Sequence, residues 1–117
     1  MSQTARFQET LRRLVIFDEG FVDAGFGLGR AGASALDAKT AALLQVAVSV
    51  AIGSSAVCLQ WGTARALAAG ATKDEIADVL LAIVPVAGLG RVVSAAHGVA
   101  AALEYDIEAA LEEPDNH

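Results

Sequence analysis

The sequence predicts an all-α fold, and three observations support this prediction. Apolar residues recur at helical spacing along most of the chain, and glycines and capping residues separate the periodic segments. No segment shows the sustained alternation of apolar and polar residues that is typical of a strand, although Leu14 to Phe17 would suit a short one. At 117 residues the chain is long enough for one domain with its own core. We therefore expect a bundle of about five to six helices.

The N-terminal part, residues 1–35, is predicted to be a helix followed by a glycine-rich linker. The helix is expected from Thr4 to about Phe17, with an apolar face formed by Phe7, Leu11, Leu14 and Val15. Glycines then accumulate from Gly20 to Gly32, which indicates a loop or a short broken helix. Residues 27–32 match the letters of the dinucleotide-binding fingerprint G-x-G-x-x-G, but that fingerprint has meaning only between a strand and a helix of a βαβ unit. Since no parallel sheet is expected, we interpret the match as part of the linker.

Two central helices are predicted between residues 38 and 69. Asp37 is a suitable N-cap for the first, which should run from about Ala38 to Ile52. Gly53-Ser54-Ser55 then breaks the helical pattern. The second helix should run from about Ser55 to Ala69, with Gly70 in the usual glycine position after a helix. Small side chains that allow close approach of helices recur in both, namely Ala47, Ala51, Ala56, Ala64 and Ala68.

The clearest local signal is a capping box in Thr72-Lys73-Asp74-Glu75, in which Thr72 and Glu75 each bond the other's backbone amide. The helix that it begins has one apolar face, made of Ile76, Val79, Leu80, Ile83, Val84 and Ala87. Pro85 should kink or end this helix, and Gly88 and Gly90 should form a turn.

A last helix is expected from about Arg91 to Leu111. The residues directed inward would be Ala96, Val99, Ala100, Leu103 and Ile107. Residues 36–111 thus form the helical domain, and residues 112–117 form an acidic, frayed tail.

The composition predicts self-association. Hydrophobic residues make up 55% of the chain and the mean hydropathy is +0.50, so one small core cannot hide all of the apolar surface. The formal net charge of −6 argues against nucleic acid, whose phosphates are bound by clustered Lys and Arg, and against an anionic membrane surface. The expected partners are therefore copies of the same chain, or a small molecule.

The uncharged stretch at residues 41–64 exceeds the ~20 residues that a membrane span requires. Polar residues and the break at Gly53 interrupt it, so two helices buried in an oligomer explain it better than a span. The first ten residues show no secretory signal, from which we expect a cytoplasmic protein. The single cysteine, Cys58, excludes an internal disulfide and a cysteine-based zinc cluster, and we expect neither a cofactor nor a metal ion.

Several segments between Leu36 and about Leu103 resemble, in order and spacing, the core of the carboxymuconolactone decarboxylase and alkylhydroperoxidase D-like superfamily. These segments are Leu36-Asp37-Ala38-Lys39-Thr40, the apolar run to Ile52, Cys58-Leu59-Gln60-Trp61, residues 66–72, Asp74-Glu75-Ile76 and residues 86–91. In the last segment Gly90 stands where a proline is common. The resemblance implies the all-α bundle of that superfamily, assembled as a trimer or hexamer.

The residues that carry dithiol chemistry in the superfamily are replaced in this chain. Redox-active relatives have C-x-x-C, a His four residues after the second Cys, and a Glu twelve residues before the first. The second Cys corresponds to Cys58, but the first corresponds to Ser55, the His to Gly62 and the Glu to Leu43. A dithiol peroxidase cycle needs a resolving thiol and a proton relay, so we expect no such cycle here. Decarboxylating relatives keep a His as acid or base, and Gly62 does not supply one.

Five residues form the candidate site. Cys58 is the candidate catalytic thiol, and His97 on the last helix is a candidate acid or base. Ser55, Trp61 and Gly62 would line a small hydrophobic pocket near them. Simpler roles compete with these, because a free cysteine is usually a buried small hydrophobe, and Trp61 and His97 suit structural packing.

Three functions remain open. The chain is a peroxidase-like oxidoreductase that uses one thiol and an outside reductant, or it is a non-catalytic ligand-binding or assembly module on the same scaffold. The third is a cofactor-free lactone decarboxylase, a lyase, in which His97 would be the titratable group.

Overall fold

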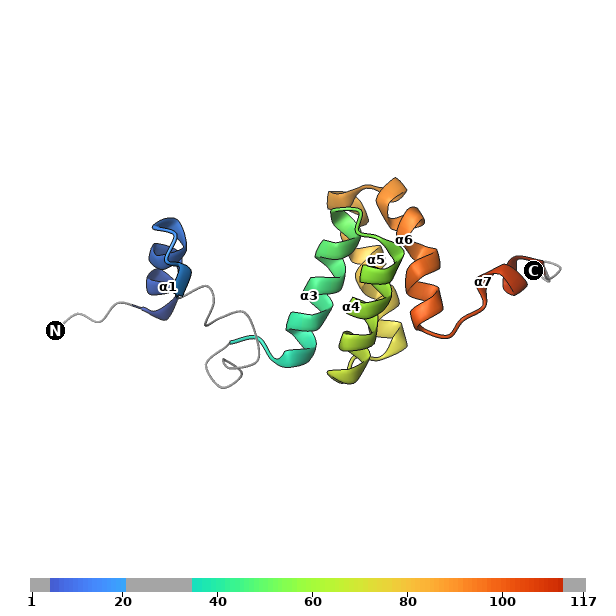
Figure 1. Ribbon diagram of the computed structural model, residues 1–117, viewed down its shortest axis with the longest axis horizontal. Coiled ribbons are helices and arrows are strands. Elements are labelled where there is room, and N and C mark those ends of the chain that lie inside the picture. Colours follow the sequence, from blue (N-terminus) through green and yellow to red (C-terminus); the bar gives the residue numbers. More distant parts are fainter. Residues whose placement is uncertain (1–4, 21–34, 113–117) are drawn as a thin grey trace. The chain divides into compact units, whose positions relative to one another are not determined.

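The computed structural model describes residues 5–20 and 35–112, and over these ranges the chain forms helices and turns without a strand (Figure 1). The predicted all-α fold is confirmed. The helices are α1 (Arg6–Val15), α3 (Ala38–Ala51), α4 (Ala56–Ala68), α5 (Lys73–Ala87), α6 (Leu89–Ala102) and α7 (Ile107–Glu112). The chain divides into two compact units, Met1–Asp37 and Ala38–His117, and each is described by itself. The G-x-G-x-x-G letters at residues 27–32, most of the predicted linker and nearly all of the predicted tail lie outside the described residues.

The first unit contains α1, which is shorter at both ends than predicted. The amide of Ala5 donates to Gln8 Oε1 at 3.0 Å, so the first turn is closed just inside the predicted start. At the other end Phe17 adopts a φ of 61°, and the amides of Phe17 and Asp18 donate back to carbonyls of the last turn. The short strand considered for residues 14–17 is therefore not formed.

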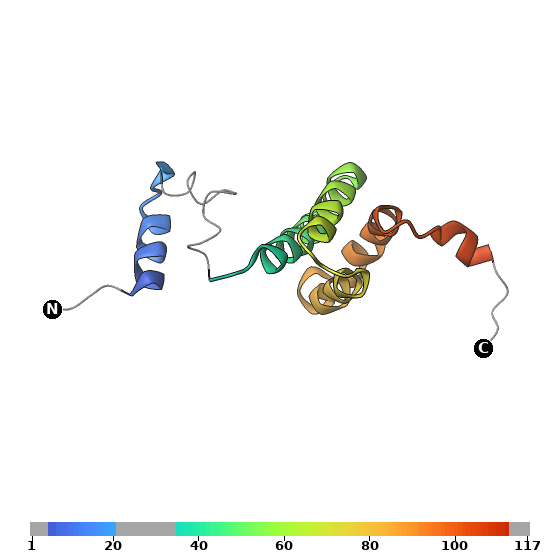
Figure 2. The same cartoon turned by 90° about the horizontal axis from the view of Figure 1, so that it is seen from below.

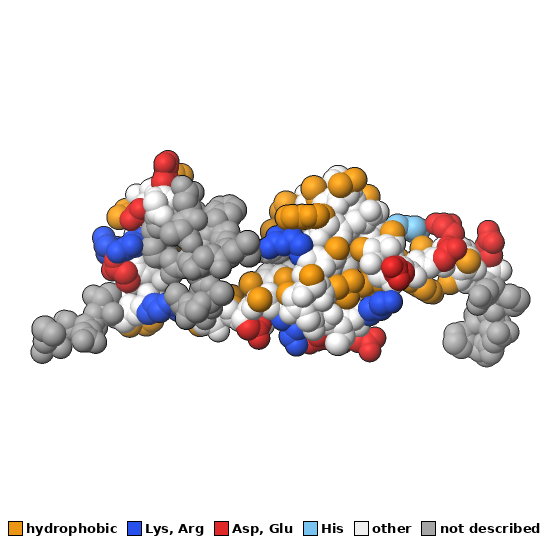
Figure 3. Space-filling model, turned by 60° about the horizontal axis from the view of Figure 1, so that its bottom comes forward, with side chains coloured by type: hydrophobic (Ala, Val, Ile, Leu, Met, Phe, Trp, Pro, Cys, Tyr) orange, Lys and Arg blue, Asp and Glu red, His pale blue; other side chains and the backbone are white. Residues whose placement is uncertain are grey.

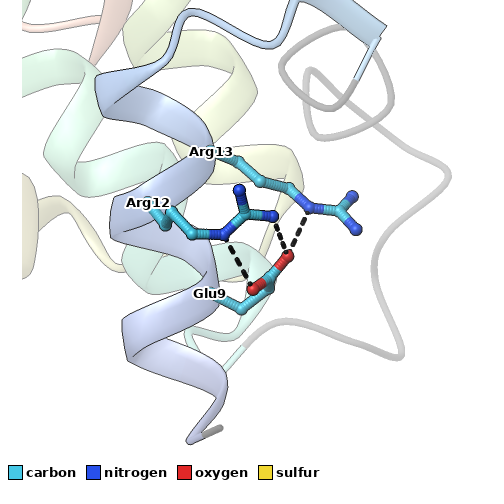
Figure 4. A network of polar contacts seen from close by, with 3 residues as sticks. All are labelled: Glu9, Arg12 and Arg13. Carbon is cyan, nitrogen blue, oxygen red and sulfur yellow. Dashed lines mark hydrogen bonds and ion pairs between the residues drawn. The ribbon is translucent and has the colours of Figure 1, made fainter.

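One carboxylate on α1, that of Glu9, is bound by two guanidinium groups (Figure 4). Arg12 donates from Nη2 to Glu9 Oε1 at 2.8 Å and from Nε to Oε2 at 3.3 Å, and Arg13 Nε donates to Oε1 at 2.8 Å. The hydrogen bonds from Arg12 and then Arg13 lower the pKa of Glu9 to about 2. Because Arg12 and Arg13 lie three and four positions after Glu9, the network stabilises α1 from one turn to the next.

The second unit contains a four-helix bundle, α3 to α6 (Figures 1 and 2). Helices α3 and α4 are neighbours joined by residues 52–55, α4 packs closely against α3 and α6, and α5 packs against α3 and α6. Gly98 of α6 lies against α4, where a Cβ would be in ordinary van der Waals contact, 3.4 Å from the Leu59 side chain and 3.6 Å from the backbone of Ala56. The core is built from Ala42, Val46, Val50, Leu59, Ala66, Ala71, Ile76, Leu80, Val92, Ala95 and Val99.

The predicted break between the two central helices is confirmed. Gly53 has a φ of 74°, and the amides of Gly53 and Ser54 donate to the carbonyls of Val50 and Ser49 at 3.1 and 3.0 Å. This is the hydrogen-bond pattern of a helix that ends at a left-handed glycine. The uncharged stretch is thereby split in two, and none of the helices in the described ranges is long and apolar enough to cross a membrane.

The predicted capping box at the start of α5 is also confirmed. The amide of Glu75 donates to Thr72 Oγ1 at 3.0 Å, and the amide of Thr72 donates to Glu75 Oε1 at 2.8 Å. The second carboxylate oxygen accepts a bond from Lys39 Nζ of α3 at 3.0 Å. The Thr72 amide, and after it Lys39, lower the pKa of Glu75. This carboxylate therefore both caps α5 and ties it to the first turn of α3.

The structure corrects the predicted end of α5. The helix continues through Pro85 to Ala87, and the turn is made by Gly88, with a φ of 92°, whereas Gly90 already belongs to α6. Pro85 cannot donate the backbone bond to the carbonyl four residues earlier, but only two residues of α5 follow it, so the helix loses that one bond and ends soon after. The predicted inner face of α5 is otherwise confirmed, with Ile76 and Leu80 buried.

The prediction of one final helix to Leu111 is wrong. Helix α6 ends at Ala102, and Glu104 adopts a φ of 60°. The amides of Glu104 and Tyr105 donate to the carbonyls of Ala101 and Ala100 at 3.1 and 3.0 Å, which closes α6 before α7 begins. Of the residues expected to point inward, Val99 and Ala100 are buried, and Ala96, Leu103 and Ile107 are half-buried.

Candidate functional site

Cys58 lies in the first turn of α4, and its side chain is exposed. Ser55 is the N-cap of this helix, and its Oγ accepts a hydrogen bond from the Cys58 amide at 3.3 Å. The backbone of Ser55 is extended, so α4 begins at the next residue, Ala56, and Cys58 is the third residue of the helix. In a single chain the interpretation of Cys58 as a buried small hydrophobe is wrong.

The surface beside Cys58 carries one aromatic and one cationic side chain. Trp61 is exposed, and the guanidinium carbon of Arg65 lies 4.8 Å from the centroid of its ring, within the range of a cation–π interaction. Gly62 is one turn from Cys58, and a Cβ built there would meet no atom within 4 Å. Residues three and four apart are neighbours on a helix, so these residues share one side of α4. In the single chain this side is an open surface rather than an enclosed pocket.

Three positions that carry redox chemistry in the superfamily the sequence resembles have other roles here. Leu43 is partly buried and packs against the core of the bundle. Ser55 caps α4, and Gly62 has no side chain. None of these residues is a carboxylate, an imidazole or a thiol, so Cys58 has neither a proton relay nor a resolving thiol at these positions.

His97 is exposed on α6, and its Nε2 lies 3.0 Å from Oε1 of Glu108 on α7. It lines an open depression of about 410 Å³ between these two helices. The other lining residues are Ala101, Glu104, Tyr105, Asp106, Ile107 and Glu108. Tyr105 and Glu108 could not be predicted as neighbours of His97 from the sequence. The turn at Glu104 brings them close to His97, and no helical spacing predicts that turn.

The two candidate catalytic residues do not share the depression beside His97. The depression beside His97 is not lined by Cys58, Ser55, Trp61 or Gly62. Those four residues lie at and after the start of α4, whereas His97 is paired across the α6–α7 turn. Over residues 5–20 and 35–112, no group of three His, Cys, Asp or Glu side chains is placed to hold a metal ion.

Comparison with known proteins gives one match. The model of the carboxymuconolactone decarboxylase family matches residues 17–103. The match begins before Leu36, the start of the segments that resemble the family, and it ends at Leu103, close to the expected end of those segments. No curated protein and no solved structure matches the chain.

Proposed function

Because the chain belongs to the carboxymuconolactone decarboxylase family, we propose that it is a divergent, self-associating member that reduces peroxides through the single thiol of Cys58. The reaction is peroxidase-like, and an external thiol serves as the reductant. The assembly expected for this scaffold is a trimer or a hexamer, with a small-molecule substrate reaching the start of α4.

The observation that carries this proposal is the position of Cys58. The thiol is exposed in the first turn of α4, where the helix backbone directs its amides toward the N-terminal end. The thiolate is the form of cysteine that attacks a peroxide. The neighbouring surface at Gly62 is open enough for a peroxide to approach.

The chemistry requires three steps. In the first, the Cys58 sulfur attacks one peroxide oxygen, the O–O bond breaks, and the alcohol leaves with one proton, so the thiol becomes a sulfenic acid. In the second, an external thiol attacks the sulfenic sulfur and water leaves, which gives a mixed disulfide. A second external thiol then releases Cys58 and forms the external disulfide. The outside reductant is needed because Ser55 stands where a resolving thiol would be.

A second candidate function is a non-catalytic ligand-binding or assembly module. The observation that favours it is the replacement of three chemical groups by Leu43, Ser55 and Gly62, each of which has a structural role or no side chain. Lactone decarboxylation is the third candidate and depends on His97, whose ring is paired with Glu108. Unchanged lactone turnover in a His97→Ala variant would exclude that version.

The test is intact-mass measurement of the purified protein after treatment with tert-butyl hydroperoxide, in the presence of a trapping reagent for sulfenic acid. The proposal predicts addition of one trapped label to the wild type and none to a Cys58→Ser variant. It also predicts continuous peroxide consumption when dithiothreitol is supplied. An unmodified Cys58 contradicts the peroxidase and leaves the binding module as the better candidate.

A further inference from the structure

The short helix α7 is only weakly held against the bundle. None of its residues is buried, and its most covered side chains, Ile107 and Ala110, are half-buried. Its first turn is capped by Asp106, whose Oδ1 accepts a hydrogen bond from the Ala109 amide at 3.1 Å. A helix of six residues is marginal by itself in water. Contacts outside α7 therefore decide whether this helix stays formed and docked.

A polar side-chain contact joins α7 to α6. His97 Nε2 lies 3.0 Å from Glu108 Oε1, across the turn in which Glu104 has a φ of 60°. The contact is an ion pair only while the imidazole of His97 carries a second proton. A neutral imidazole can at most donate one hydrogen bond without a positive charge, which is the weaker interaction. The strength of the contact therefore depends on protonation.

The other charged groups around His97 are all acidic. The depression between α6 and α7 is lined by Glu104, Asp106 and Glu108 and by the phenol of Tyr105. Among the described residues that line it, His97 alone can carry a positive charge, and no side chain of α3, α4 or α5 contributes. Figure 3 shows acidic side chains (red) gathered beside the histidine (pale blue) on this part of the surface. A protonated His97 offsets the repulsion among the three carboxylates, whereas a neutral one leaves that repulsion uncompensated.

We propose that the His97–Glu108 pair is a pH-sensitive latch that docks α7 on α6 when His97 is protonated and releases α7 when the imidazole is neutral. Histidine ordinarily changes charge between about pH 6 and 7, whereas carboxylates stay ionised above about pH 5. Docking is therefore strongest at about pH 5 to 6 and weakens as the pH rises. Release opens the depression, because five of its lining residues, Glu104 to Glu108, follow the end of α6. The latch does not depend on the thiol of Cys58.

The test measures the helical population of α7 through the Cα chemical shifts of Ala109 and Ala110, at about pH 5.5 and about pH 8. Carbon detection is used because exposed amide signals fade at the higher pH. His97→Gln removes the titrating group and keeps a side chain that can donate a hydrogen bond. The matched control is His117→Gln, the same change at the other histidine of the chain, which lies outside the described residues. Circular dichroism confirms that each variant is folded.

The expected result is a pH dependence that requires His97. In the wild type and in His117→Gln, the ratio of docked to released α7 should be roughly twofold to fivefold higher at the lower pH, the range for an exposed ion pair. In His97→Gln the ratio should be low at both pH values. In His97→Arg, whose guanidinium group is always charged, α7 should stay docked at both pH values.

Three results would overturn the inference. The first is a helical population of α7 in the wild type that is the same at both pH values. The second is an equal pH dependence in the wild type and in His97→Gln, which would assign the response to another group. The third is release of α7 at the higher pH in His97→Arg as in the wild type. An unreactive Cys58 would contradict the proposed function alone, because the latch is measured without peroxide.

Discussion

The guanidinium group of Arg91, in the first turn of α6, occupies the space into which a side chain at Gly53 would project. A Cβ built on Gly53 would collide with Nη1 of Arg91 and would lie 3.2 Å from its Cζ. Gly53 also has a φ of 74°, a conformation that glycine adopts without strain. The link between α3 and α4 therefore favours glycine through its own backbone, and a side chain there would in addition require the flexible end of Arg91 to move.

These two effects can be separated by experiment. Gly53→Ala should lower the free energy of unfolding by about 1 kcal/mol, measured by urea denaturation, because it adds backbone strain while the flexible end of Arg91 moves aside. Gly70→Ala is the comparison without a neighbour, since Gly70 has a φ of 100° and open space around it, and it should cost at least as much. Adding Arg91→Ala should leave the cost at Gly53 unchanged. A cost at Gly53 that falls when Arg91 is removed would show that Arg91 does not move aside freely.

Glu104→Gly should stabilise the protein. Glu104 ends α6 with a φ of 60°, a conformation that costs a residue with a Cβ about 1 kcal/mol relative to glycine. The gain is reduced by the greater freedom of glycine in the unfolded chain. We expect a rise in Tm of a few degrees, measured by calorimetry at fixed protein concentration. Glu104→Ala keeps the Cβ and should give no such rise. A similar rise in both variants would show that the left-handed backbone of Glu104 is not what destabilises the wild type.

Thr72→Ala should destabilise α5. The substitution removes the hydroxyl that accepts the Glu75 amide at 3.0 Å, and the loss of an N-cap of this kind costs about 1 kcal/mol. Thermal unfolding followed by circular dichroism should show a Tm lower by roughly 4 °C. Thr72→Ser keeps the hydroxyl and should retain most of the stability. A Thr72→Ser variant as unstable as Thr72→Ala would assign the effect to the lost methyl group instead.

Ser55→Cys should give Cys58 a resolving thiol. The new thiol would lie at the N-cap of α4, three residues from Cys58, in the spacing that redox-active members of the family use. After one equivalent of peroxide, we expect an internal disulfide, seen by mass spectrometry as the loss of two hydrogens. The wild type should give a trapped sulfenic acid instead. A trapped sulfenic acid in both proteins would show that the start of α4 does not allow the two sulfurs to meet.

The stability of α1 should depend on pH through Glu9. Its pKa of about 2 lies below the ordinary value of 4.5, so the ionised carboxylate stabilises α1 above about pH 4.5, and this contribution is lost as the pH falls toward 2. Titration of the Glu9 carboxyl by NMR should give the low midpoint. In an Arg12→Gln/Arg13→Gln variant the midpoint should rise toward 4.5. A wild-type midpoint near 4.5 would mean that the pair of guanidinium groups does not hold the carboxylate in solution.

Elements with a strong local cause were predicted well from the sequence. The capping box of Thr72 and Glu75 and the turns at Gly53 and Gly70 depend on bonds within a few residues, so their residue types already contain the necessary information. The end of α6 was missed because Glu104, a residue without the conformational freedom of glycine, adopts the left-handed conformation there. The turn is closed by backbone bonds to Ala100 and Ala101, and no glycine or asparagine marks it in the sequence.

The candidate site was predictable in its chemistry but not in its arrangement. The sequence by itself determined an all-α chain of the carboxymuconolactone decarboxylase family, with one thiol and with Leu43, Ser55 and Gly62 in place of its partners. Only the tertiary structure decided that Cys58 is exposed and that His97 pairs with Glu108, beside a depression that Cys58 does not line. Residue identity determines which groups exist, whereas burial and pairing depend on how helices distant in sequence pack and where each one ends.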